Sequence, residues 1–191
     1  MAKQVAQFEK ITYEQFEKDF RNIFTWGDIV AFGLIPYRFT EPDSSAVAAV
    51  IQKIYNNIKL PKRGTKGSAG YDFFCPMSVK LKSGNTITIP TGIKCKINPD
   101  WVLKLYPRSG LGFKYRLQLD NSVGIIDSDY YNNISNEGHI MAKITNDSYE
   151  DKTAVLEKGK GFVQGIFVEY GITMDDKATS IRNGGFGSTS K

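Results

Sequence analysis

The hydrophobic period of this 191-residue chain changes once, near Leu60. Beyond Leu60 apolar and polar residues alternate singly, as in the run 93–97, where Ile93, Cys95 and Ile97 take one face and two lysines the other. A period of two is typical of a half-buried β-strand. Strands are predicted at 79–82, 87–89, 93–97, 102–106, 117–119, 139–144 and 162–170, separated by Gly, Pro, Asn and Asp. Many short strands with such punctuation predict an all-β barrel or sandwich.

Before Leu60 the apolar period is helical instead. Thr12 and Gln15 form a capping-box pattern, and the phenylalanines at 16, 20 and 24 then recur on one face, which predicts a helix over 13–25 that ends at Trp26-Gly27-Asp28. A second helix is predicted after the loop 41–45, with an apolar stripe at residues 51, 54, 55 and 58. Both stripes are expected to pack on the main domain or on a neighbouring subunit.

Three regions follow from these patterns. Residues 1–58 are predicted to be a helical N-terminal extension, and residues 59–180 the β domain. Residues 181–191, with the sequence IRNGGFGSTSK, are too rich in glycine to hold one conformation alone and are predicted to be a flexible C-terminal arm.

Charge is unevenly distributed over these regions. The net charge is +5, yet residues 1–58 carry six Lys/Arg and seven Asp/Glu, which leaves 19 minus 13, or +6, for the remainder. The excess positive charge of the later part therefore suits an anionic ligand, either nucleotide phosphates or nucleic acid. The alternative is that this charge only keeps the protein surface soluble.

The sequence also indicates a cytoplasmic protein. The longest apolar run, 29–36, is far shorter than the roughly 20 residues that span a bilayer, and the N-terminus lacks the features of a secretory signal. Cys75 and Cys95 have no metal-ligand spacing and are expected to be free thiols in a reducing cytosol, that of the host if the source is a virus. The only histidine, His139, is interpreted as a polar residue at a strand edge rather than a catalyst.

The stretch 121–131, NSVGIIDSDYY, places an apolar run between polar ends. Its isoleucines favour a strand and Asp127-Ser128-Asp129 supplies turn chemistry, so the stretch predicts a tight hairpin that presents Asn121, Asp127 and Tyr130. Asp-rich turns are common, and this segment alone does not establish a ligand site.

Four further segments suit an anionic, planar ligand. The run 107–114, PRSGLGFK, combines a guanidinium, a hydroxyl and a backbone opened by glycine, as phosphate binding requires. The others are SAGYD at 68–72, GKGFVQ at 159–164 and the arm, where Phe186 lies among glycines. An arm that closes over a ligand could stack Phe186 on a base.

Together the five segments resemble, in order, the motifs of the trimeric dUTP diphosphatase (dUTPase) family. The matching segments are AGYD at 69–72, PRSGLGFK at 107–114, NSVGIIDSDY at 121–130, GKGFVQ at 159–164 and RNGGFGSTS at 182–190. The resemblance spans 69–190 and implies a dUTPase-like β-barrel or jelly roll that assembles as a homotrimer with shared active sites. It also implies hydrolysis of dUTP to dUMP and pyrophosphate with Mg²⁺, which lowers dUTP and supplies dUMP for thymidylate synthesis.

The resemblance implies a role for each matched residue. Asp127 would be the general base that activates the attacking water, and Tyr130 would pack on the deoxyribose and exclude a ribose hydroxyl. Asn121, with the backbone around Gly124 and Ile126, would read the uracil edge, and Asp72 would reach Mg²⁺ through water. The remaining substrate contacts implied are Arg108, Ser109, Gly110, Gln164, Arg182, Phe186, Gly187, Ser188 and Thr189.

Three departures from the family pattern stand out. Lys160-Gly161 replaces a frequent Asp-Arg, Tyr131-Asn132 replaces a frequent Arg-Gly, and the arm is one residue shorter between Arg182 and Phe186, which leaves the reach of Arg182 open.

Three other functions are the alternatives to dUTP hydrolysis. The related dCTP deaminases resemble a pattern with a catalytic glutamate where this chain has Tyr131. A non-enzymatic nucleic-acid binder would need aromatics on a strand platform, whereas these motifs concentrate polar groups in turns, so no nucleic acid and no membrane partner is expected. A regulatory protein-binding role alongside catalysis is the third alternative, with the N-terminal extension as its candidate surface.

Overall fold

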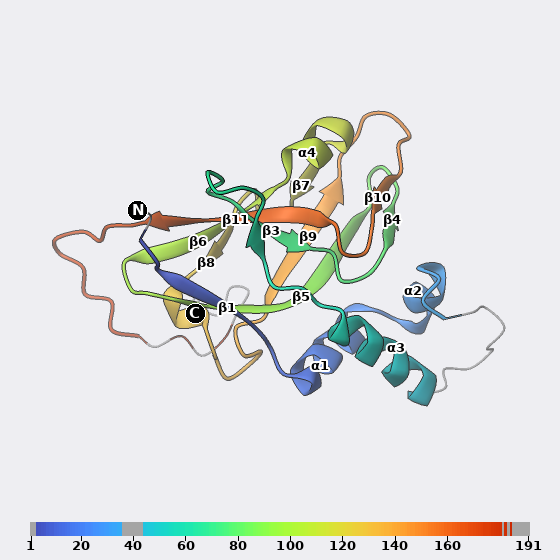
Figure 1. Cartoon of the computed structure of the whole chain (residues 1–191), viewed down its shortest axis with the longest axis horizontal. Coiled ribbons are helices and arrows are strands. Elements are labelled where there is room, and N and C mark those ends of the chain that lie inside the picture. The colour runs from blue at the N-terminus through green and yellow to red at the C-terminus, as the bar shows by residue number, and fades with distance from the viewer. Residues whose placement is uncertain (1–2, 36–43, 181, 183, 185–191) are drawn as a thin grey trace.

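A computed structural model describes residues 3–35, 44–180, 182 and 184 of the chain (Figure 1). The described strands form three antiparallel sheets. The four-stranded sheet has the order β1-β5-β9-β7, with β1 at Ala6–Lys10, β5 at Thr86–Ile97, β9 at Ile140–Asn146 and β7 at Leu117–Leu119. The five-stranded sheet has the order β2-β3-β11-β6-β8, with β2 at Lys62–Arg63, β3 at Tyr71–Phe74, β11 at Gly161–Glu169, β6 at Trp101–Pro107 and β8 at Gly124–Ile126. A two-stranded sheet pairs β10, Ala154–Leu156, with β4, Val79–Leu81.

The core receives the inward faces of both larger sheets. β9 alternates buried and less buried residues along its whole length, as the predicted period of two requires. The fully buried large side chains come mainly from the N-terminal helices and from strands of both larger sheets, and include Phe16, Phe20, Ile51, Phe73, Ile89, Leu103 and Phe162. The all-β prediction is therefore confirmed, and the apolar stripes of the N-terminal helices join the same core.

The three helices of the N-terminal region gather on one side of the β domain (Figure 1). α1, Tyr13–Ile23, begins where Thr12 accepts a hydrogen bond from the Gln15 N–H, as predicted, and packs on both α3, Ser44–Asn56, and β5. α2, Trp26–Ala31, was not predicted, because Trp26-Gly27-Asp28 was interpreted as the end of α1. Thr25 and Asp28 form a reciprocal capping box there, which starts a new helix instead.

The N-terminal extension is not purely helical, which corrects the prediction. Its first element is β1, which pairs with β5 from Ala6 opposite Ile97 to Lys10 opposite Ile93. Because β5 supplies the hydrogen-bonding partner, the pairing depends on a contact far along the chain rather than on the weak local pattern of 6–10. No helix among the described residues is long and apolar enough to cross a membrane.

The predicted hairpin over 121–131 is also corrected. β7 pairs with β9 and β8 pairs with β6, so the connection 120–123 crosses from one sheet to the other. Ser122 adopts a positive φ of 62° and its N–H donates to the Leu119 carbonyl, which closes this tight connection. The run 121–131 thus begins in a connection between two sheets and reaches the core at Tyr130.

Both cysteines are buried and free, as expected. Burial raises the pKa of the Cys75 thiol to about 12 and raises that of Cys95 as well. Neither thiol is therefore suited to nucleophilic chemistry at neutral pH.

Candidate active site

A pocket of about 330 Å³ lies where the 120–123 connection, β8 and β9 meet. Five of the residues implied as substrate contacts line it: Asn121, Gly124, Ile126, Tyr130 and Arg182. Its walls are mainly apolar, with Asp120 and Lys143 among the polar residues. Such a lining, with few polar groups, suits a small planar ligand that needs orientation by specific hydrogen bonds.

β8 offers its backbone to that pocket, because it is the edge strand of the five-stranded sheet. An edge strand leaves N–H and C=O groups unpaired along one side, and these can meet the polar edge of a planar base. Gly124 faces Leu105 of β6 so closely that a Cβ there would lie 3.0 Å from the Leu105 Cβ. A larger residue at 124 would therefore push β8 away from the sheet.

Tyr130 is buried, with 7% of its surface exposed, and closes one side of the pocket. Its hydroxyl donates to the His139 carbonyl at 2.9 Å and accepts from Asn136 Nδ2 at 2.8 Å. Burial raises the pKa of Tyr130 and outweighs the opposing effect of Asn136, so the phenol stays protonated. Because the hydroxyl proton is donated to the His139 carbonyl, it is not available to a ligand, and the ring is the part of Tyr130 that we expect to contact one.

Asp127 immediately precedes the short 3₁₀ helix η1, Ser128–Tyr130. Its carboxylate is half exposed and pairs with Arg182, whose guanidinium also bonds Asp129 at 2.9 Å between Nε and Oδ1. The guanidinium carbon lies 5.9 Å from the centre of the Tyr130 ring. Arg182, implied as a substrate contact, thus pairs with two carboxylates in this structure.

A second cluster joins motifs from β3, β6 and β11. Arg108, just after β6, pairs with Asp72 of β3 at 3.1 Å between Nε and Oδ1 and donates to the Gly161 carbonyl. A Cβ at Gly161 would lie 3.1 Å from Arg108 Nη1, so the glycine that replaces a frequent arginine leaves room for Arg108. Gln164 lies opposite Asp72 in the β11–β3 register and against Gly70.

Ser109 and Gly110 were predicted in a phosphate-binding turn, and the structure places them in the first turn of α4, Ser109–Tyr115. Both are exposed, and among the described residues no atom of another segment lies within 4 Å of the position of a Cβ on Gly110. The backbone is therefore open to a ligand at this point. α4 ends at Arg116, which has a positive φ of 49°.

The family resemblance implies that Asp72 reaches a metal ion through water. Among the described residues, no group of three or more His, Cys, Asp or Glu side chains could hold an ion. Asp72 is a single carboxylate already paired with Arg108, which makes it a poor direct ligand. Mg²⁺ commonly keeps several waters and binds phosphates with one or two carboxylates, and a water-mediated role of Asp72 fits that preference.

The remaining implied contacts, Phe186, Gly187, Ser188 and Thr189, lie outside the described residues, as does most of the predicted arm. Among the described residues, those implied to contact the base and the sugar line the pocket. Asp72, Arg108 and Gln164 lie together in the second cluster. β6 joins the two, since it pairs with β8 on one side and with β11 on the other.

The interpretation of His139 as a strand-edge residue is wrong. His139 is fully buried, with Nδ1 2.7 Å from Asp19 Oδ2 and Nε2 accepting from the Gly92 N–H at 2.9 Å. One signal was available in the sequence. Asp19 lies three residues after Phe16 on the apolar face of α1, and a carboxylate on such a face needs a buried partner.

Comparison with known proteins agrees with this geometry. The dUTPase family model matches residues 56–190. The deoxyuridine 5′-triphosphate nucleotidohydrolase of Lactococcus lactis is 43% identical over 143 residues, which cover 73% of this chain and 94% of that protein. The crystal structure of dUTPase from Streptococcus mutans has a TM-score of 0.55 at 43% identity, over 62% of this chain and 90% of that chain.

A more distant structure shows the fold alone. It is a mutant dUTPase from phage phi11 of S. aureus, described with a structural Mg(II) ion, with a TM-score of 0.52 at 20% identity over 67% of this chain and 94% of that chain. The family match covers most of the present chain, and the pocket residues fall inside it. The chain therefore belongs to the dUTPase family.

Proposed function

We propose that the protein hydrolyses dUTP to dUMP and pyrophosphate, the activity after which its family is named. The observation that supports this most is the 330 Å³ pocket, because it brings Asn121, an edge-strand backbone and the buried Tyr130 ring together beside Asp127. The product dUMP is the precursor for thymidylate synthesis, and removal of dUTP lowers its cellular level.

Uracil is recognised by its polar edge. The unpaired side of β8 and the Asn121 amide present donors and acceptors to the base. In this proposal the pocket also excludes the methyl group of thymine. Tyr130 packs its ring against the 2′ carbon of the sugar. A ribose hydroxyl would collide with that ring, which cannot swing away while its own hydroxyl is bonded to His139 and Asn136.

Asp127 acts as the general base. It takes a proton from a water molecule, whose oxygen forms a bond to the α-phosphorus while the bond from that phosphorus to the oxygen bridging to the β-phosphate breaks, and pyrophosphate leaves. A positioned base of this kind contributes about 10²–10⁴ in rate. Arg182 must leave Asp127 for this to happen, and the phosphate chain of dUTP offers the guanidinium a stronger, bidentate partner.

The phosphates bind at the second cluster. The Ser109 hydroxyl, the open backbone at Gly110 and the Gln164 amide contact the phosphates, and Arg108 adds a supporting charge. From the arm, Arg182, Ser188 and Thr189 contact the phosphates, Phe186 stacks on the uracil base, and Gly187 is a further substrate contact. Asp72 would help to hold Mg²⁺ through water, and the bound ion would supply charge neutralisation at the phosphates.

We further propose a homotrimer in which neighbouring chains share each active site, as is typical of the family. The buried thiols of Cys75 and Cys95 suit the reducing cytoplasm in which we place the enzyme. Light scattering coupled to size exclusion tests the assembly, and a mass of one chain rather than three would contradict it.

Pyrophosphate release measured on all deoxy- and ribonucleoside triphosphates tests the function. We expect dUTP to be the one good substrate. Turnover of UTP at a similar rate would contradict the role of Tyr130, and formation of uracil nucleotides from dCTP, detected by chromatography, would show a deaminase instead.

A further inference from the structure

The loop of residues 131–139 determines where the Tyr130 ring lies. Tyr130 accepts from Asn133 Nδ2 at its carbonyl, at 2.9 Å, and donates from its hydroxyl to the His139 carbonyl, also at 2.9 Å. Gly138 has a φ of +79°, and a Cβ there would lie only 2.5 Å from the Tyr130 carbonyl oxygen. Both ends of the tyrosine are therefore held by one tightly folded loop.

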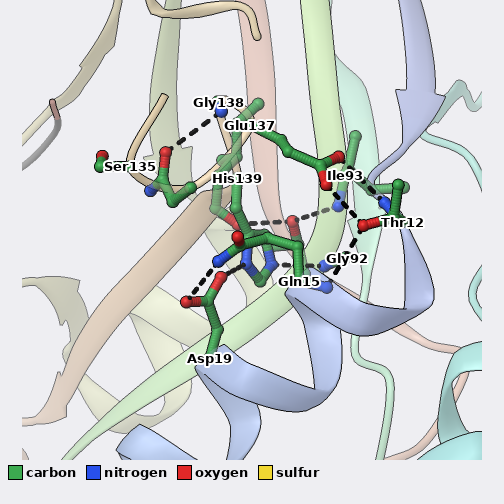
Figure 2. A network of polar contacts seen from close by, with 12 residues as sticks. Thr12, Gln15, Asp19, Gly92, Ile93, Ser135, Glu137, Gly138 and His139 are labelled. Carbon is green, nitrogen blue, oxygen red and sulfur yellow. Dashed lines mark hydrogen bonds and ion pairs between the residues drawn. The ribbon is translucent and has the colours of Figure 1, made fainter. Parts of the chain in front are cut away.

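The N-terminal extension holds that loop through three side-chain contacts. Tyr131, where relatives often carry arginine, donates its hydroxyl to Glu9 of β1 at 2.8 Å. Glu137 accepts from the Thr12 N–H at 3.0 Å, at the start of α1. His139 bonds Asp19 of α1 (Figure 2). All three partners lie outside residues 56–190, the part that matches the family model.

The Asp19–His139 contact is the most buried of the three. Because a backbone N–H can only donate, the Gly92 N–H requires Nε2 of His139 to be the acceptor, and Nδ1 therefore carries the proton that is donated to Asp19. Asp19 also accepts from Gln15 Nε2 at 2.9 Å (Figure 2). Loss of the carboxylate would leave a donor of His139 buried without an acceptor, and the residue would shift to find one.

We propose that Asp19 and His139 are positioning residues that fix the Tyr130 ring, so that the N-terminal extension sets the selectivity of the pocket for deoxyribose over ribose. The path is short, since His139 receives the Asp19 contact on its ring and the Tyr130 hydroxyl on its own carbonyl. The inference rests on the proposed dUTP hydrolysis and deepens it, because it assigns part of the sugar selectivity to residues outside the pocket.

The test compares three variants in the full-length protein. Asp19→Ala removes the acceptor, whereas Asp19→Asn keeps an oxygen that can accept from His139 Nδ1. Glu17→Ala is the matched control, since Glu17 is another carboxylate of α1 but pairs with Arg21 on the helix surface. kcat and KM are measured for dUTP and for UTP, and the melting temperature is measured for each variant.

We expect Asp19→Ala to lower the ratio of kcat/KM for dUTP to that for UTP by about tenfold, the effect of one lost hydrogen bond to a charged group. KM for dUTP should rise more than kcat falls. Asp19→Asn should restore most of the ratio, and Glu17→Ala should leave it at the wild-type value.

A lower melting temperature of Asp19→Ala with an unchanged ratio would overturn the proposal, because the contact would then be only structural. If Asp19→Ala does not fold, Asp19→Ser replaces it, since the shorter polar side chain withdraws the acceptor from His139 Nδ1. An unchanged ratio in that variant would overturn the proposal equally. The selectivity for deoxyribose is also measured as the ratio of the dissociation constants of the α,β-imido analogues of UTP and dUTP. Absent dUTP turnover in the wild type would contradict the proposed function, while the binding ratio would still test the positioning role.

Discussion

At the scale of single residues, Asp127 and Asp129 both pair with the same arginine side chain. They lie two positions apart, and Arg182 pairs with both. The chemical role that we propose belongs to Asp127 alone, because it precedes η1 at the position that matches the third motif of the family. Asp129 then only anchors Arg182. The two carboxylates therefore form a matched pair for mutation.

We predict that Asp127→Asn lowers dUTP turnover by about 10²–10⁴, the range for loss of a general base. The amide can still accept a hydrogen bond from Arg182 but cannot take a proton from water. Pyrophosphate release measures turnover, and calorimetry with α,β-imido-dUTP should show affinity within a few-fold of wild type. Asp129→Asn should keep near-normal turnover, so an equal loss in both variants would argue against the assignment.

At the scale of elements, Glu137 docks the start of α1 onto the 131–139 loop. It accepts from both the N–H and the hydroxyl of Thr12, and the Lys94 ammonium lies 3.6 Å from its Oε2. Burial acts to raise the pKa of Glu137, but the Thr12 hydrogen bonds and Lys94 together outweigh it, so the pKa is lowered from its ordinary 4.5. The ionised form is therefore the one that holds the helix.

This shift predicts a pH dependence of stability. Because the folded-state pKa lies below the unfolded one, the stabilisation by Glu137 is fully present above about pH 4.5 and is lost as the pH falls through the folded-state pKa. Urea unfolding of wild type and Glu137→Gln should therefore show a free-energy difference at pH 7 that shrinks toward pH 3. A difference that is constant over that range would exclude this role of Glu137.

At the scale of the whole molecule, the N-terminal extension is a structural part of the β domain. β1 covers the edge of β5, and the Ile11 N–H donates to the Gly92 carbonyl. A Cβ at Gly92 would lie 2.2 Å from Ile58 Cδ1, so the segment after α3 meets β5 in close contact. Phe16, Phe20 and Ile51 belong to the same core as the strands.

We predict that a chain of residues 59–191 aggregates, although most of the family match lies within it. Its β5 edge and the apolar face beneath α1 and α3 would meet water, and an open apolar edge promotes association. Light scattering and thermal unfolding measure this outcome. Deletion of 184–191 is the control and should leave wild-type unfolding but much lower dUTP turnover. A monodisperse 59–191 chain that melts as the wild type does would show the extension to be dispensable for folding.

The sequence by itself determined the β architecture, the start of α1 at Thr12, the positions of most strands and the five motifs of the family. These features are local, since a period of two, a cap or a motif is complete within a few residues. Two local signals were nevertheless misread. Thr25 and Asp28 start α2, and Ser109–Tyr115 is a helix instead of a turn.

Only the tertiary structure decided how the segments meet. It paired β1 with β5, sent β7 and β8 into different sheets, and buried His139 against Asp19, 120 positions earlier in the chain. Such contacts depend on which distant surfaces come together, and the local pattern of neither partner contains that information. The proposed positioning of Tyr130 is a contact of this type. The tyrosine belongs to a motif that can be recognised in the sequence, whereas the residues that hold it lie in the N-terminal extension, outside that motif.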